Sequence, residues 1–382
     1  MKSKKFPIRP AALLVAGTLF LAPMSLAQTI ATAAGTAPAA PVAPAASSDV
    51  ARWSDAVWNA ARSGDLETVE KSLKAIPESR ATAESKRLRE IVAARATHVD
   101  EGTKTRDADR AKALEDLKAE VAKGEITKAL TAAVKYQTLS DDMGAALHVP
   151  EIIELAKSAE GAYAKAEEQG DWLIAQEILY RLRTLNEVSD GGTFRALDKQ
   201  LDEVNKRITL LAQYAPRELW RLRKAYAEKA DPGKPFPEFN EAFAEDWRES
   251  LEGISKGMLA SALNTAANEH ISAGGWEPLV KGGLDAVRVL ATTPALKENF
   301  PGLADAEKTR VLVDAVARNL EGLARMNRDT IGKPQLNAAL RDVLEANAKG
   351  PDLPLTVVFR EFGDGALEEL AGRFEDEYSQ VI

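Results

Sequence analysis

The carboxyl-terminal stretch Leu353–Ile382 reads Leu-Pro-Leu-Thr-Val-Val-Phe-Arg-Glu-Phe-Gly-Asp-Gly-Ala-Leu-Glu-Glu-Leu-Ala-Gly-Arg-Phe-Glu-Asp-Glu-Tyr-Ser-Gln-Val-Ile. Its apolar side chains recur at steps of three and four, which places them on one face of a helix: Val358, Phe359, Phe362, Ala366, Leu367, Leu370 and Phe374. We expect partial packing of this face, with Phe359 and Phe362 buried and the last turn from Tyr378 to Ile382 exposed. Because the stretch ends on apolar residues, we also expect it to lead toward a further domain.

Upstream, three short turns share one pattern, in which a glycine is followed by an acidic residue, a bulky apolar residue and, three positions later, a small or β-branched one. The copies are Gly64-Asp65-Leu66 with Val69, Gly124-Glu125-Ile126 with Ala129, and Gly170-Asp171-Trp172 with Ala175. Glycine tolerates the left-handed conformation that ends a helix, and an acidic side chain is favourable at the positive end of the next helix dipole. The pattern predicts helical hairpins that resemble tetratricopeptide repeats. Because the copies are unequally spaced, we expect a degenerate helical-hairpin array over residues 49–230.

A highly charged helix is expected between the first two turns, at about residues 79–122. Its apolar stripe is narrow, and Gly102-Thr103 marks a place where it could break in two. The stretch is compatible with a long coiled-coil-like hairpin. A solvent-exposed helix with charge pairs three and four residues apart is the favoured alternative.

The amino terminus has the pattern of a targeting segment. Four basic residues precede the apolar run Ala11–Ala22, Pro23 breaks that run, and Ser25-Leu26-Ala27 places small residues at a cleavage position. The run is shorter than the roughly 18 residues that a spanning helix needs. We therefore predict a signal peptide at residues 1–27 and export to the periplasm or cell envelope; an uncleaved membrane anchor is the alternative. Residues 28–48, rich in alanine and proline, are predicted to be a disordered linker.

Composition limits the fold and the partners. The chain has no cysteine, so neither a disulfide framework nor a lipoprotein attachment site is expected. Without the targeting segment the net charge is about −12, which argues against nucleic acid or anionic lipid as a partner. The aromatic fraction of 6% and the abundance of strong helix formers favour an all-α fold.

The strongest break in the predicted mature chain is Asp231-Pro-Gly-Lys-Pro-Phe-Pro237. We place a domain boundary there, with a second helical domain at residues 238–382. That domain opens with a bulky apolar stripe that we expect in its core: Phe239, Phe243, Trp247, Leu251, Ile254, Met258 and Leu259.

A search for chemistry finds no catalytic pattern. The three histidines, His98, His148 and His270, lack metal-ligand spacing. Nucleophile elbows, Walker-type loops and dinucleotide fingerprints are absent, and the Gly-Gly pairs at 191, 274 and 282 are predicted to be turns or close helix contacts. Neighbouring carboxylates such as Glu368 and Glu369, or Glu375, Asp376 and Glu377, are predicted to be solvated. Four tryptophans either line a ligand groove or pack in the core, with the core favoured: Trp172, Trp220, Trp247 and Trp276. We therefore predict no catalytic residue, no cofactor site and no metal site.

Four stretches in the second half resemble a known family. They are Asp246-Trp247-Arg248-Glu249 with Gly253-Ile254; Gly282-Gly283-Leu284-Asp285-Ala286 with Thr293-Pro294-Ala295-Leu296; Phe300-Pro301-Gly302-Leu303; and Glu361-Phe362-Gly363-Asp364-Gly365-Ala366 with Asp376, Tyr378 and Ser379. Together, over about residues 240–382, they resemble the helical region that precedes the protease core in exported bacterial carboxyl-terminal processing (tail-specific) serine peptidases. The chain departs from that pattern at Glu375 and Glu377, which stand where leucine and proline are expected, and in a longer spacing after Ala366.

The resemblance implies a role but supplies no catalytic residue, because the family's Ser-Lys dyad lies further downstream than this chain extends. It implies a non-catalytic helical platform that positions substrate or the protease core, with a PDZ-protease module as partner. The alternative is a free-standing cell-envelope scaffold that binds peptides or partner proteins; an independent hydrolase is a distant third.

Overall fold

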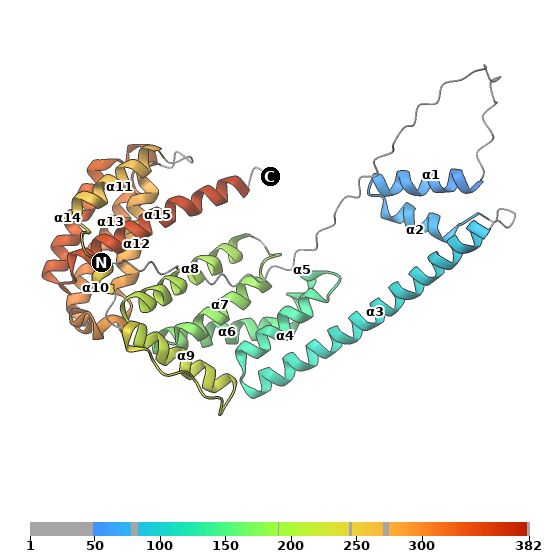
Figure 1. Ribbon diagram of the computed structural model, residues 1–382, viewed down its shortest axis with the longest axis horizontal. Helices are drawn as coiled ribbons and strands as arrows, with labels where there is room; N and C mark the ends of the chain where they lie inside the picture. Colours follow the sequence, from blue (N-terminus) through green and yellow to red (C-terminus); the bar gives the residue numbers. More distant parts are fainter. Residues whose placement is uncertain (1–48, 78–82, 190, 244–246, 270–274, 380–382) are drawn as a thin grey trace, which may run out of the picture. The chain divides into compact units, whose positions relative to one another are not determined.

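The computed structural model describes residues 49–77, 83–189, 191–243, 247–269 and 275–379 (Figure 1). Every regular element in these residues is an α-helix or a 3-10 helix, so the predicted all-α fold is confirmed for this part of the chain. The predicted signal peptide at residues 1–27 and linker at residues 28–48 lie outside the described residues. The chain divides into two compact units, Met1–Ala96 and Thr97–Ile382, and each is described by itself.

The first unit holds α1 (Asp49–Arg62), α2 (Leu66–Lys74) and the beginning of α3 (Ala83–Lys123). Gly64 ends the first helix with a φ of 72°, and the Asp65 carboxylate accepts the backbone N–H of Thr68 at 3.0 Å. The indole N–H of Trp53 donates to the carbonyl of Ser72 at 2.6 Å, which ties α1 to α2. The first predicted turn therefore forms a helical hairpin.

Helix α3 runs through Gly102-Thr103 without a break, so the interruption that the sequence allowed there does not occur. The Thr103 hydroxyl donates to the carbonyl of Val99 at 2.9 Å, one turn back, within regular helix. All side chains from residue 97 to 109 are exposed, and Lys104 pairs with Asp100 at 2.7 Å. A lone glycine costs only about 1 kcal/mol in a helix, which the neighbouring helix formers offset. This part of the helix has the solvent-exposed character favoured from the sequence.

The second unit contains the rest of α3 and the following described elements: α4 (Ile126–Thr138), α5 (Met143–Ala146), α6 (Pro150–Gln169), α7 (Trp172–Leu185), α8 (Gly191–Tyr214), α9 (Pro216–Ala230), η1 (Glu241–Phe243), α10 (Trp247–Ser250), α11 (Lys256–Glu269), α12 (Trp276–Ala291), η2 (Pro294–Glu298), η3 (Pro301–Ala304), α13 (Ala306–Ala324), η4 (Arg328–Thr330), α14 (Lys333–Lys349) and α15 (Leu355–Ser379).

The second and third predicted turns are built like the first. Gly124 and Gly170 are left-handed, with φ of 75° and 73°, and α4 and α7 begin two residues after them. Helix α6 packs on α7, and α7 in turn packs on α4 and α8. Neither Glu125 nor Asp171 makes a side-chain cap hydrogen bond. Although the three turns share one conformation, the tetratricopeptide-like repeat character of the array stays a prediction.

Two hydrophobic clusters fill the second unit. The smaller lies among α4, α6 and α7, with Leu117 from α3. The larger runs from α7 through α8 and α9 into α11–α15, so Tyr214 and Leu219 belong to the same cluster as Trp247 and Phe300. The predicted boundary at Asp231–Pro237 is free of helix, but the core is continuous across it. The division into two helical domains there stays a prediction.

Helices α12 and α15 form the most extensive helix pair of the fold. Their backbones approach at glycines: a Cβ added to Gly282 would lie 2.3 Å from the carbonyl oxygen of Gly365, and one added to Gly283 would lie 2.4 Å from the Phe362 ring. The Gly-Gly pair at 282 is thus a close helix contact, one of the two predicted alternatives.

The apolar face of α15 is buried as predicted over most of its length. Val358, Phe359, Phe362 and Leu370 are buried, whereas Leu367 is 43% exposed because it lies beside the contact rather than in it. The Phe374 side chain and the turn from Tyr378 to Ile382 lie outside the side chains that the structure describes. As far as Leu370, the helix is a packed element of the fold.

The apolar stripe expected in the core at the start of the second domain is buried only in part. Part of it falls on η1, α10 and α11, and Gly253 turns the chain between the last two with a φ of 84°. Trp247, Leu251 and Leu259 are buried, but Met258 is 60% exposed. The Phe243 side chain lies outside those described.

Candidate functional site

The residues that the sequence offered as candidates for chemistry do not come together in the described part of the chain. His98 and His148 are exposed, and His270 lies outside the described residues. Within the described part of the chain no group of three or more metal-binding side chains comes together. Glu368 pairs with Lys206 at 3.1 Å and Glu369 with Lys281 at 2.8 Å, while the side chains of Glu375, Asp376 and Glu377 are not described. Of the helices described, none is long and apolar enough to cross a membrane.

The tryptophans divide between the two predicted environments. Trp172 is buried in the core, as favoured, and Trp276 is half-buried. Trp220 and Trp247, on α9 and α10, line one cavity. This cavity, which we call the aromatic pocket, is the candidate functional site.

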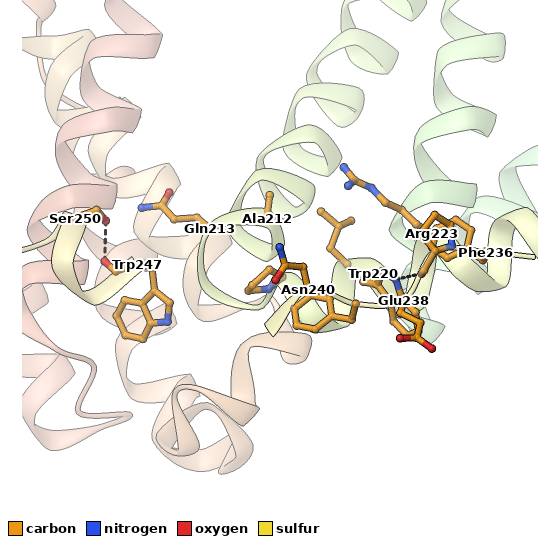
Figure 2. A pocket seen from close by; sticks show the side chains of 13 residues that line it. Ala212, Gln213, Trp220, Arg223, Phe236, Glu238, Asn240, Trp247 and Ser250 are labelled. Atoms are coloured by element: carbon orange, nitrogen blue, oxygen red, sulfur yellow. Dashed lines mark hydrogen bonds between the residues drawn. The ribbon is translucent and has the colours of Figure 1, made fainter. Parts of the chain in front are cut away.

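The aromatic pocket has a volume of about 590 Å³ and lies among the end of α8, the first half of α9, the segment 236–240 and α10 (Figure 2). Its lining is mainly aromatic, aliphatic and proline: Ala212, Gln213, Pro216, Leu219, Trp220, Arg223, Phe236, Pro237, Glu238, Phe239, Asn240, Trp247 and Ser250. The volume falls within the range of pockets that hold a small ligand or a few residues of a peptide.

One wall forms because the chain turns back along α9. Gly233, with a φ of 95°, follows the end of that helix. The indole N–H of Trp220 then donates to the carbonyl of Pro237 at 2.9 Å. The rings of Phe236 and Phe239 lie 6.0 and 6.1 Å from the Trp220 ring, at centroid distances typical of aromatic pairs. A proline-rich segment without regular structure thus packs on Trp220 of α9.

The other end of the pocket is backed by the core. The Trp247 ring packs edge-on against Tyr214, at 5.4 Å between centroids, and against Phe300, at 5.6 Å. Trp247 is only 7% exposed, yet its indole nitrogen has no hydrogen-bond partner in the described structure. The Ser250 hydroxyl beside it donates to the Trp247 carbonyl at 2.7 Å and is therefore already engaged.

The remaining polar groups at the pocket include donors and acceptors, among them the exposed carboxylate of Glu238. The side-chain oxygen of Asn240 accepts the N–H of Ala242 at 3.1 Å, so this bond does not use the amide N–H groups of Asn240. Gln213 donates to the Tyr214 hydroxyl at 3.1 Å, which leaves its carbonyl oxygen as an acceptor. Arg223 is exposed and makes no ion pair with any described residue.

A buried carboxyl group outside the aromatic pocket contacts Tyr214. Glu361 of α15 is 8% exposed, and its Oε1 accepts the hydroxyl of Tyr214 at 2.5 Å. Burial raises the pKa of Glu361 to about 7, although the hydrogen bond from Tyr214 acts in the opposite direction. Burial, and then the neighbouring Glu361 charge, raise the pKa of the Tyr214 hydroxyl. This pair was not predicted from the sequence.

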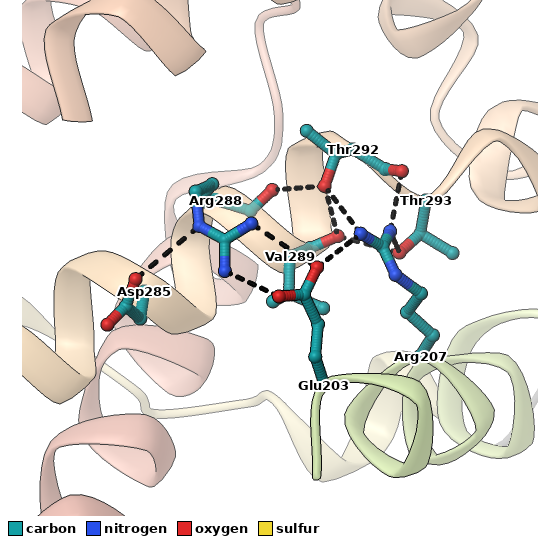
Figure 3. A network of polar contacts seen from close by, with 7 residues as sticks. All are labelled: Glu203, Arg207, Asp285, Arg288, Val289, Thr292 and Thr293. Carbon is teal, nitrogen blue, oxygen red and sulfur yellow. Dashed lines mark hydrogen bonds and ion pairs between the residues drawn. The ribbon is translucent and has the colours of Figure 1, made fainter. Parts of the chain in front are cut away.

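A second polar network joins α8 to α12 (Figure 3). Glu203 accepts from Arg207 at 2.7 Å and from Arg288 at 2.8 Å. Burial raises the pKa of Glu203, but the two guanidinium groups outweigh it and the net shift is downward. Arg207 also donates to the carbonyl of Thr292 at 2.6 Å and lies over the Trp172 ring. Arg288 also pairs with Asp285 at 3.4 Å, so the network ties α8 to α12 through several charged and polar contacts.

Comparisons with known proteins give no relative: no protein family, no curated protein and no solved structure matches this chain. The class of protein must therefore be inferred from the pocket and its surroundings.

Proposed function

We propose that this protein is a non-catalytic helical scaffold that binds an apolar segment of another protein in the aromatic pocket. The observation that carries the proposal is a cavity of about 590 Å³ walled by four aromatic side chains and two prolines on a helical frame. At protein interfaces a few residues in well-packed pockets, often tryptophan or tyrosine, supply most of the binding energy. Apolar surface of this kind, rimmed by polar side chains, is typical of interaction sites.

Rigid support strengthens this assignment. Pro216 begins α9, and Trp247 packs against Tyr214 and Phe300, so these two sides of the pocket are held by a helix and by the core. Binding to a preformed site avoids much of the entropy cost of ordering side chains. The pocket is thus suited to recognising a segment without rearrangement of the fold.

The peptidase-platform role implied by the family resemblance remains a proposal of the same class, since it also assigns binding to this chain and chemistry to another module. Packing of α15 against α12 as far as Leu370 supports the free-standing scaffold, because that face then has its partner within the chain. The reading frame beyond codon 382 discriminates between the two: continuation into a PDZ module and a Ser-Lys core supports the platform.

The test is binding of an unfolded polypeptide, for which we choose fluorescently labelled, carboxymethylated α-lactalbumin, followed by anisotropy. Trp220→Ala is expected to weaken binding by about 10- to 30-fold, since truncating a central interface tryptophan costs about 2 kcal/mol. Trp58→Ala is the matched control, because Trp58 of α1 is 60% exposed and does not line the pocket. The bound polypeptide is expected to stay intact. Absence of binding by the unmodified protein, or equal binding by all three proteins, would refute the proposal.

A further inference from the structure

We infer that a second cavity, between α8 and α15, binds a linear aliphatic polyamine whose ammonium groups pair with the carboxylates of Asp202 and Glu361. This inference does not depend on the proposed function of the aromatic pocket. It follows from the negative charges that the second cavity leaves without a cation.

The second cavity, which we call the acidic cavity, has a volume of about 290 Å³. Its lining comes from α8, α12 and α15. The ionisable residues of the lining are Asp202 and Lys206 of α8 and Glu361, Asp364 and Glu368 of α15. Four carboxylates thus face a single ammonium group, and the pairing among them decides what a ligand can add.

Glu361 offers the acidic cavity a carboxylate oxygen without a partner. The residue is 8% exposed, and its Oε1 accepts the Tyr214 hydroxyl at 2.5 Å. The other oxygen, Oε2, makes no hydrogen bond with a described residue and is not among the buried unpartnered atoms, so it is open to the cavity that Glu361 lines. The neighbouring cation, Arg360, is paired with Asp364. A cation brought by a ligand would therefore stabilise the ionised form of a buried carboxyl group.

Asp202 is the second carboxylate of the acidic cavity without a cation. It makes no ion pair with a described residue, and burial, followed by the Asp198 charge, raises its pKa. The two cations that act on it are engaged elsewhere, since Lys206 pairs with Glu368 at 3.1 Å and Arg183 pairs with Asp198. Once these pairs are counted, the cavity retains two negative charges.

The placement of these two charges defines the shape of the ligand. Asp202 and Tyr214, the residue that holds Glu361, lie about three helical turns apart on α8. Leu210 lies between them on the same helix, and Val289 of α12 also lines the cavity, so part of the lining is apolar. Ammonium groups separated by methylene chains match this pattern. The single ammonium group of a lysine side chain would neutralise only one of the two carboxylates.

The probe is spermidine, an unbranched polyamine, and n-butylamine, which carries one ammonium group, is the control ligand. Binding is measured by titration calorimetry at pH 8 and low ionic strength, because salt screens exposed charges. Asp202→Asn and Glu361→Gln each remove one charge while keeping the shape of the side chain. Glu252→Gln is the matched control, since Glu252 is exposed and does not line the acidic cavity.

We expect one spermidine to bind per chain, at least about 10-fold more tightly than n-butylamine. Asp202→Asn and Glu361→Gln should each weaken spermidine binding by about 10-fold or more, the worth of a hydrogen bond between charged groups. Glu252→Gln should leave the affinity unchanged.

The pH dependence of binding gives a readout that a loss of packing would not produce. With a pKa of about 7, Glu361 is about one-tenth ionised at pH 6 and about nine-tenths ionised at pH 8, so the affinity for spermidine should rise about 10-fold over this range. Glu361→Gln should abolish this rise, whereas Asp202→Asn should retain it. The ionisable groups around Glu361 are Tyr214, Asp202 and Lys206 of α8 and Arg360, Asp364 and Glu368 of α15, while the α12 residues of the lining, Ala286 and Val289, carry no charge.

No saturable binding of spermidine, equal affinity for spermidine and n-butylamine, or equal weakening by Glu252→Gln would overturn the inference. A rise of affinity with pH that persists in Glu361→Gln would also overturn it. Binding of unfolded α-lactalbumin is measured at the other pocket, so the two proposals can fail separately.

Discussion

Replacing Glu361 by glutamine should remove a pH dependence of stability that originates in one buried carboxyl group. Glu361 is 8% exposed and accepts the Tyr214 hydroxyl, and burial raises its pKa from 4.5 to about 7. A carboxyl whose pKa is higher in the folded state holds its proton more tightly when folded. Its contribution to stability is therefore fully present below pH 4.5 and is lost as the pH rises through about 7.

The size of the effect follows from the shift. A difference of about 2.5 pKa units, at about 1.4 kcal/mol each, corresponds to about 3 kcal/mol of unfolding free energy lost between pH 4.5 and pH 8.5. Nearby charges contribute in both directions: Asp364 and Glu368 raise the pKa of Glu361, and Arg360 lowers it. Asp202 and Lys206 of α8 line the same small cavity as Glu361.

Urea denaturation followed by circular dichroism from pH 5 to pH 8.5 measures the effect. Glutamine keeps an oxygen that can accept the Tyr214 hydroxyl but cannot ionise, so Glu361→Gln should match the unmodified protein at pH 5 and exceed its stability by about 3 kcal/mol at pH 8.5. Glu252→Gln removes an exposed carboxylate and should keep the original pH dependence. A flat pH profile in the unmodified protein, or an unchanged slope in Glu361→Gln, would show that this carboxyl is not the source.

Two further predictions concern the contact between α12 and α15. Gly283→Ala should destabilise the protein by about 1–3 kcal/mol, because the new Cβ would lie 2.4 Å from the Phe362 ring. Gly322→Ala is the control: a Cβ there has no atom within 4 Å, so this change should be neutral or stabilising. Equal melting temperatures for the two variants would contradict the close contact. Ending the chain after Gly350 should lower the free energy of unfolding by several kcal/mol, since each buried large apolar side chain of α15 contributes about 1.5–3 kcal/mol. A truncated chain that melts at the original temperature would mean that the helix is only a linker.

Local patterns in the sequence were sufficient for the helices and their turns. The left-handed glycines at 64, 124 and 170 follow from a steric preference of one residue, and burial of Val358 and Phe362 follows from spacing along one helix. The continuity of α3 at Gly102 was not predictable in this way, because a glycine inside a helix only lowers stability and its flanking residues decide the outcome.

The buried carboxyl has a signal in the sequence, although it was not predicted. Glu361 lies three residues after Val358 and next to Phe362, so it falls on the apolar face of its own helix. A carboxylate on such a face must find a partner, here Tyr214 from a helix 147 residues away in sequence. The partner is set by tertiary packing, which spacing along one helix does not encode.

The aromatic pocket was predictable only in part. Trp220 and Trp247 line the cavity, and Trp247 also belongs to the core as favoured, whereas Phe236, Phe239 and Asn240 were not predicted to lie there. These residues reach the pocket because the segment after α9 turns back, and that path depends on contacts between the segment and the helix rather than on a repeating pattern. The proline-rich segment Asp231–Pro237 was predicted to be a domain boundary, and in the structure its last residues also form a wall of the aromatic pocket.

Buried polar groups in the core differ in whether they have a hydrogen-bond partner. Gln137 donates to the carbonyl of Leu185 at 2.8 Å, and Asn347 exchanges two hydrogen bonds with the backbone of Leu353. Trp172 also has an unpartnered indole nitrogen, but its ring is covered by the guanidinium of Arg207 at 4.8 Å. An unsatisfied donor costs free energy wherever it lies, but only one that borders a cavity can be satisfied by a ligand. Trp247 lines the pocket with other atoms of its side chain, while its indole nitrogen is buried, so the N–H is a cost of packing and the proposed binding rests on the apolar walls of the pocket.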